Sequence, residues 1–250
     1  MDLWLSGLSV DGSQEAESGR AGASTPPPNV RVPRCGRRPS RRPMTAPIRH
    51  AGDVPGPAGL EIIIGMTEIP DEPLPVLTRS ALIVPVPSAE PVVGRHRRIM
   101  DRSAVGGVPA HVTVLYPFLP PAEIDDAVVE AVAEVLREVP AFDCTFSEVA
   151  WFGEHLVWLR PDPDHRFRAL TNAVWERFPL HRPYAGVHDP VPHLTVGDAQ
   201  LADLPTLQRV AEEIATELPI TAHVDEVRLM AGAYEPDSWR SLAVFPLVAL

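Results

Sequence analysis

Two short motifs in this chain contain the same residue types, His111-Val112-Thr113 and His193-Leu194-Thr195. Residues i and i+2 of a strand share one face, so each motif presents an imidazole and a hydroxyl together and aliphatic side chains opposite. Histidine titrates near neutral pH, and two histidines can divide the roles of general base and general acid. Threonine hydroxyls can donate to oxygens on which negative charge develops. The paired motifs predict acid–base chemistry at a phosphodiester.

The motifs open two similar stretches of chain, separated by 82 residues. In each stretch the hydrophobic pattern predicts the order strand, helix, strand, strand. Strands are expected at 81–86, 110–115, 142–147, 155–160, 191–196, 221–230 and 241–247, and helices at 124–136, 167–178 and 204–218. Asp164 and Asp203 are expected to cap the second and third helices. The repeat predicts a duplicated, two-lobed α+β unit in which the two polar strand faces converge on a central cleft.

The ordered domain is expected at 78–250, after a disordered extension at 1–77 that is rich in proline and arginine. Such a composition buries too little apolar surface to offset the entropy of ordering. Its arginine cluster could bind an acidic partner, although a solvated tail is the simpler interpretation.

All 22 basic residues are arginine, which excludes a lysine nucleophile, a Schiff base and a P-loop lysine. Residues 66–250 carry 14 arginines against 27 acidic residues, a net charge of −13. An acidic domain is a poor platform for long nucleic acid, because phosphate contacts supply most of that affinity. The two cysteines, Cys35 and Cys144, predict no disulfide framework, so a cytoplasmic protein is expected, without a membrane span or a signal peptide.

The segments Ala110–Phe118 and Pro192–Val196 resemble the two-histidine phosphoesterase superfamily, which includes bacterial 2′-5′ RNA ligases and 2′,3′-cyclic nucleotide phosphodiesterases. The resemblance covers roughly residues 80–250. It implies two antiparallel sheets with flanking helices and a metal-free, cofactor-free site between the lobes. It implies His111 and His193 as catalytic groups and Thr113 and Thr195 as phosphate ligands. It also implies cyclic phosphate hydrolysis or reversible 2′-5′ ligation, and the acidic domain favours a small nucleotide.

Several aromatic residues near the motifs are further candidates. Tyr184 could stack on a nucleobase or pack between the lobes. Strict alternation along the strand puts Tyr116 on the face opposite His111, so it is expected in the core. Trp151 and Phe152 are also expected in the core.

Two polar groups near the motifs have competing interpretations. One of Arg95, Arg97, Arg98 and Arg102 could reach the phosphate, but a solvated surface cluster is favoured. The residues His181, His188, Asp189 and His193 could be considered a metal site, yet their spacing matches no compact zinc signature. Loop histidines are the simpler account.

The sequence thus predicts a monomeric, metal-independent hydrolase of a 2′,3′-cyclic phosphate or related nucleotide phosphodiester, such as an RNA end. His111 and His193 are its base and acid in unassigned order. A non-catalytic nucleotide-binding module, reversible 2′-5′ RNA ligation and a metal-dependent hydrolase are the alternatives.

Overall fold

The computed structural model describes residues 76–249, which form an α+β domain. Its strands are β1 (Arg79–Pro85), β2 (His111–Leu115), β3 (Phe142–Phe152), β4 (Leu156–Asp162), β5 (Leu194–Asp198), β6 (Ile220–Val224), β7 (Glu226–Gly232) and β8 (Arg240–Pro246). The α-helices of these residues are α1 (Glu90–Met100), α2 (Arg102–Val105), α3 (Asp126–Leu136), α4 (Asp164–Arg177) and α5 (Leu204–Ala215). The extension predicted at 1–77 lies outside the described residues, apart from 76 and 77.

The strands form two four-stranded antiparallel sheets, with the orders β2-β1-β7-β8 and β5-β4-β3-β6. The predicted class, two antiparallel sheets with flanking helices, is therefore confirmed. The first motif opens β2 and the second leads into β5, and both strands are the terminal strands of their sheets. Each pairs with the strand that precedes it in the chain, β1 or β4. The pseudo-two-fold axis proposed from the repeat stays a prediction.

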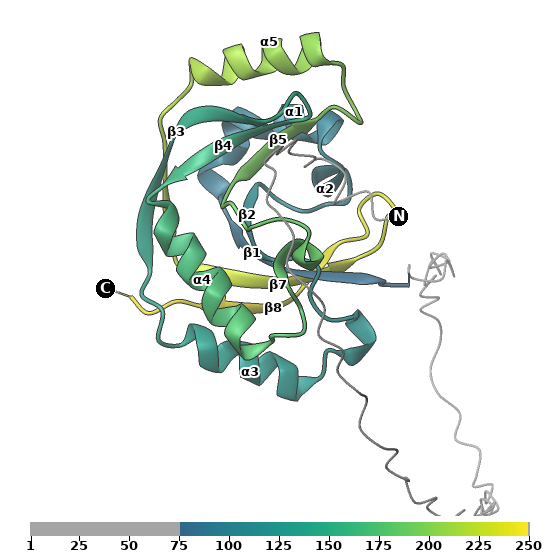
Figure 1. Cartoon of the computed structure of the whole chain (residues 1–250), viewed down its shortest axis with the longest axis vertical. Coiled ribbons are helices and arrows are strands. Elements are labelled where there is room, and N and C mark those ends of the chain that lie inside the picture. Colours follow the sequence, from purple (N-terminus) through teal and green to yellow (C-terminus); the bar gives the residue numbers. More distant parts are fainter. Residues whose placement is uncertain (1–75, 250) are drawn as a thin grey trace, which may run out of the picture. The chain divides into compact units, whose positions relative to one another are not determined.

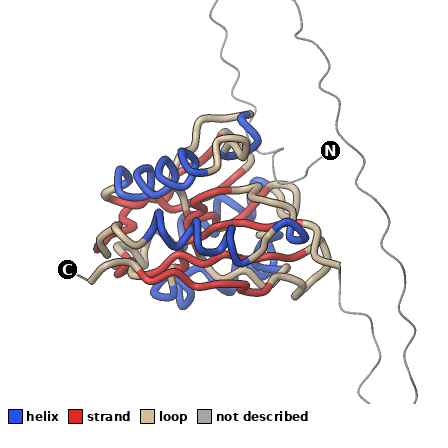
Figure 2. Tube along the Cα trace, turned by 90° about the horizontal axis from the view of Figure 1, so that it is seen from below, coloured by secondary structure: helices blue, strands red, loops and turns tan. Residues whose placement is uncertain are grey.

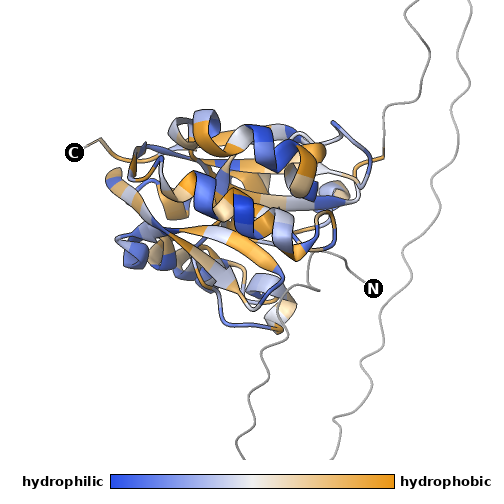
Figure 3. Ribbon diagram, turned by 90° about the horizontal axis from the view of Figure 1, so that it is seen from above, coloured by the Kyte–Doolittle hydropathy of each residue, from blue (hydrophilic) through white to orange (hydrophobic). Residues whose placement is uncertain are grey.

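Helices cover the sheets on their outer sides, as Figures 1 and 2 show. Helix α5 contacts β3, α1 contacts β5, α3 contacts β8, and α4 contacts β2. The longer helices α1, α3, α4 and α5 each carry a set of buried residues, and Figure 3 shows both hydrophilic and hydrophobic residues along the helices. The apolar sides and one face of each sheet build the main core, with Leu82, Val112, Phe146, Leu159 and Leu194 fully buried. The motif side chains lie on the opposite faces of the sheets.

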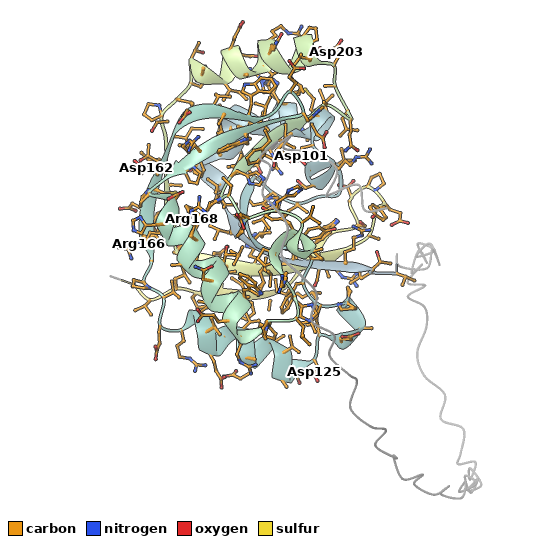
Figure 4. The ribbon with its side chains drawn as sticks, viewed as in Figure 1. Asp101, Asp125, Asp162, Arg166, Arg168 and Asp203 are labelled. Carbon is orange, nitrogen blue, oxygen red and sulfur yellow. The ribbon has the colours of Figure 1, made fainter. Side chains whose placement is uncertain are left out.

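Capping aspartates fix where two of the helices begin. The Asp125 carboxylate accepts a hydrogen bond from the Val128 backbone N–H at the start of α3. The Asp203 carboxylate accepts one from the Thr206 backbone N–H at the start of α5; Figure 4 labels both aspartates. The expectation for Asp164 is wrong. Pro163 occupies the cap position, and Asp164 lies inside the first turn, where its carboxylate accepts from Arg168.

Other local expectations are corrected or confirmed. The segment predicted as one strand at 221–230 is two strands, β6 and β7, which belong to different sheets. Cys144 is a small buried side chain, and burial raises its pKa to about 12. No helix within residues 76–249 has the length and hydrophobicity needed to span a lipid bilayer.

Candidate active site

The two motif strands come from different sheets and contact each other. His111 lies opposite Pro85 and Thr113 opposite Ile83, so both motif side chains of β2 share one sheet face. Thr195 lies opposite Trp158 on β4, and His193, two residues earlier, shares that face. The two histidines are close enough for the charge of His193 to lower the pKa of His111. The fold therefore brings the two predicted motifs together.

Both histidine rings are held in the same way. The Nδ1 atom of His111 lies 2.7 Å from the Pro109 carbonyl oxygen, and that of His193 lies 2.7 Å from the Val191 carbonyl oxygen. A carbonyl can only accept, so Nδ1 carries the proton in both neutral rings. The other ring nitrogen, Nε2, then holds the lone pair that can take up a proton. Each ring is thus prepared for proton transfer through Nε2.

Burial shapes the protonation of both rings. Loss of solvation is the main cause that lowers the pKa of His111 to about 4, and the positive charge of Arg97 adds to it. Loss of solvation also lowers the pKa of His193, while the Val191 carbonyl and the Asp101 carboxylate oppose that shift. Both imidazoles are therefore neutral at pH 7 before substrate binds, and an anionic phosphate beside them will raise both pKa values.

Aromatic side chains surround His193. The ring centroids of Phe152, Trp158 and Tyr184 lie 5.2, 5.9 and 6.4 Å from that of His193. Tyr184 stacks on the imidazole, whereas Phe152 meets it edge-on and stacks on Trp158. The expectation that Phe152 belongs to the core is wrong, while Trp151 packs against the core as predicted.

The loop that carries Tyr184 has an unusual backbone. Tyr184 and Ala185 adopt left-handed conformations, with φ of 50° and 53°, within the 3₁₀ segment Pro183–Gly186. The Tyr184 N–H donates to the Tyr116 carbonyl oxygen at 2.7 Å, which ties this loop to the end of β2. Burial raises the pKa of the Tyr184 phenol, so the ring is neutral at physiological pH.

A β-bulge changes the position of Tyr116. Ile83 pairs with Thr113 but Leu82 pairs with Leu115, so β2 contains one extra residue. Tyr116 therefore turns to the face of His111 and Thr113, not to the opposite face that strict alternation predicts. It is buried in a second core cluster with Ile83, so the expected burial is confirmed.

Beside Tyr116 lies a pocket of about 240 Å³. Its walls come from the start of β1, the segment after β2 and the Tyr184 loop; the lining residues are Thr78, Arg79, Ser80, Tyr116, Pro117, Phe118, Leu119, Pro120 and Ala185. Arg79 donates to the Tyr116 hydroxyl at 2.6 Å, and its guanidinium lies 3.9 Å from the centre of the Tyr234 ring. The pocket thus shares the Tyr184 loop with the His193 environment.

The four arginines before the first motif behave differently from one another. Arg95 and Arg98 are exposed, and Arg95 pairs with Glu213 on the surface. Arg97 is only 1% exposed and is bound to Asp101, which caps the start of α2 (Figure 4). The expectation of a solvated arginine is therefore wrong for Arg97. Its i,i+4 spacing from Asp101 is the sequence signal that could have predicted this ion pair.

The metal interpretation receives no support from the side-chain geometry. Among the described residues no group of three or more His, Cys, Asp or Glu side chains is arranged to hold a metal ion. His181 lies against the Phe118 ring, at 6.0 Å between centroids, and His193 lies among aromatic rings.

One family model matches this chain, and several solved structures are similar to it. The family model of the 2′-5′ RNA ligase superfamily matches residues 84–233. No match was found among curated proteins. Among solved structures, E. coli LigT complexed with 3′-AMP is 19% identical, with a TM-score of 0.45 over 69% of this chain and 99% of that one. A structure described as a phosphoesterase (18%, TM-score 0.44, 69% and 99%) and TT0787 of Thermus thermophilus (15%, TM-score 0.44, 68% and 97%) are also similar.

Proposed function

The chain belongs to the 2′-5′ RNA ligase superfamily, whose model spans more than half of its length, and we propose that it hydrolyses a 2′,3′-cyclic nucleotide phosphate without a metal ion. One observation carries the proposal. Two imidazoles on neighbouring strands are each locked by a carbonyl at Nδ1, so that both Nε2 atoms serve for proton transfer.

The reaction needs one base and one acid. One neutral imidazole removes a proton from water, and the resulting hydroxide attacks phosphorus. A bond between phosphorus and one ribose oxygen breaks as the second, protonated imidazole donates its proton to that oxygen. The product is a nucleoside monophosphate, and the two rings exchange protons with solvent to complete the cycle.

The threonines supply the phosphate-binding groups in this proposal. Thr113 and Thr195 are half-buried and follow their histidines on the same strand faces. Their hydroxyls can donate to the non-bridging oxygens, on which negative charge increases in the transition state.

Phosphorus-31 NMR tests the function directly. Purified protein is incubated in EDTA with 2′,3′-cyclic AMP, GMP, CMP and UMP. Ring opening by the wild type, with a chemical shift that identifies the 2′- or 3′-phosphate, supports the proposal. Activity that disappears in EDTA and returns with zinc or manganese would favour a metal-dependent hydrolase. Tight nucleotide binding without any ring opening would favour a binding module.

Ligation is the second reaction of this superfamily, and its test is separate. An oligoribonucleotide with a 2′,3′-cyclic end and one with a 5′-hydroxyl are mixed with the protein, and the joined product is measured by gel electrophoresis. The net charge of −13 over residues 66–250 disfavours binding of two strands, so we expect hydrolysis to dominate.

Removing either motif hydroxyl should slow the reaction. Thr113→Val and Thr195→Val keep the branched side chain and delete one donor to a charged oxygen, so kcat/KM should fall roughly 10-fold or more in each. Steady-state kinetics on the cyclic nucleotide measure this. Thr145→Val, a half-buried threonine on β3, is the matched control and should leave kcat/KM unchanged. Equal rates in all three variants would contradict phosphate binding by the motif threonines.

Tyr184 and the adjacent pocket are proposed to hold the nucleoside. Base stacking on an aromatic ring contributes about 1–3 kcal/mol, so Tyr184→Ala should raise KM roughly 10-fold, and Tyr184→Phe should resemble the wild type. Alanine fits this backbone conformation, since Ala185 adopts it already. A fall in kcat with unchanged KM would instead indicate that Tyr184 acts through His193.

A further inference from the structure

Arg97 is a charged side chain in the interior with a nearly complete set of polar partners. Its Nε and Nη2 atoms lie 2.9 and 2.8 Å from Asp101 Oδ2, and Nη2 donates to Ser103 Oγ at 3.0 Å. Asp101 also accepts from the Ser103 backbone N–H at 2.9 Å and, with Oδ1, lies 2.8 Å from the Ser103 hydroxyl. Glu90 lies 3.8 Å from Nη1. A buried ion pair of this kind rarely adds stability over apolar residues, which suggests another role.

Two sets of hydrogen bonds lead from this cluster to the first catalytic strand. The Ser103 carbonyl accepts the Val108 N–H at 2.9 Å, and the Glu90 carboxylate accepts the Ala110 N–H at 2.5 Å. Between these two anchored residues lies Pro109, whose carbonyl accepts from His111 Nδ1. The cluster therefore fixes the position of the one carbonyl that sets the tautomer of His111.

The charges of the cluster also affect the pKa values of the two histidines differently. His111 is affected by Arg97, which opposes its protonation, by Asp101, which favours it, and by the charge of His193 on the other sheet. Among the described residues, the charged side chain with a marked influence on His193 is Asp101, which favours protonation. The Pro109 and Val191 carbonyls act in the same direction on the two rings. The positive charge of Arg97 thus lowers the pKa of His111 and has no marked influence on the pKa of His193.

We propose that Arg97 is a positioning residue that acts through Asp101, Ser103 and the Pro109 carbonyl to hold the His111 ring with Nδ1 donating and Nε2 available for proton transfer. This role rests on the proposed function.

Three variants test the role of Arg97. Arg97→Met removes the charge, Arg97→Lys keeps the charge but not the planar fork, and Arg97→Met combined with Asp101→Leu removes both charges so that no unpaired carboxylate is buried. The pH dependence of kcat/KM is measured for each. We expect kcat to fall in all three. The pKa of His111 in this profile should rise in the single and double methionine variants, because Arg97 then no longer opposes its protonation, and should stay in place with lysine. A wild-type rate and profile in the double variant would overturn the proposal.

A second measurement does not depend on turnover. Nitrogen-15 NMR of labelled histidines reports which ring nitrogen carries the proton, and His111→Asn identifies the His111 signals. The wild type should show the Nδ1-protonated tautomer of His111, and the double variant should show a mixture. An unchanged tautomer would refute the positioning role even if the protein hydrolyses no cyclic nucleotide, which separates this failure from failure of the proposed function.

Discussion

Replacement of either motif histidine should lower turnover of a 2′,3′-cyclic nucleotide by at least about 10²-fold, because each proton transfer is worth about 10²–10⁴ in rate. His111→Asn and His193→Asn are preferable to alanine. The asparagine amide can still donate to the carbonyl two residues earlier, so the strand geometry is retained while proton transfer is lost. Initial rates by phosphorus-31 NMR, with KM measured separately, give the size of the effect.

The control for this experiment is His165→Asn, an exposed histidine of α4 that belongs to neither motif. It should retain wild-type activity. The double variant His111→Asn/His193→Asn should be little slower than either single variant, because two groups that act as one unit give non-additive losses. Wild-type activity in both single variants would refute the two-histidine mechanism.

The free energy of unfolding should fall steeply in acid because of His111. Above about pH 6.5 the ring is neutral in both states. As the pH falls from about 6.5 to about 4, the unfolded chain binds a proton that the folded protein does not, so the unfolded state is favoured. A pKa lowered from 6.5 to about 4 corresponds to about 3 kcal/mol. His193 contributes in the same direction.

Chemical denaturation of the wild type and of His111→Asn at several pH values measures this contribution. Carboxylates also titrate in acid, so the useful quantity is the difference between the two proteins. The free energy of unfolding of His111→Asn should decline less than that of the wild type between neutral pH and about pH 4.5. Parallel curves would show that His111 is not protonated more readily in the unfolded chain.

The four motif residues were predictable because type and spacing alone place them on equivalent strand faces. Of the aromatic neighbours of His193, Tyr184 was a candidate from the sequence, whereas Phe152 and Trp158 were not. Trp158 reaches the site because it lies opposite Thr195 on the neighbouring strand, and cross-strand partners cannot be read from one sequence. The face of Tyr116 was missed for a related reason, since nothing in the local pattern marks the extra residue of β2.

The secondary structure likewise includes elements that the local pattern predicts and elements that it does not. Helices with regular apolar spacing, such as α3 and α5, were predicted to within a few residues. Helix α1 is absent from the helices predicted above, because its buried side includes Arg97 beside Val93 and Met100, and a buried arginine interrupts the apolar pattern. The role of that arginine depends on partners that only the folded structure brings together.

The position of β2 and β5 at the ends of their sheets has a consequence for how the protein could diversify. Each strand is bonded along one side only, so the two motif histidines meet where the sheets adjoin and no ladder of backbone hydrogen bonds connects them. Substitutions that change the packing between the sheets could therefore widen or narrow the site while both strands remain intact. Mutational libraries confined to this junction offer a route to new substrate sizes with the acid–base pair retained.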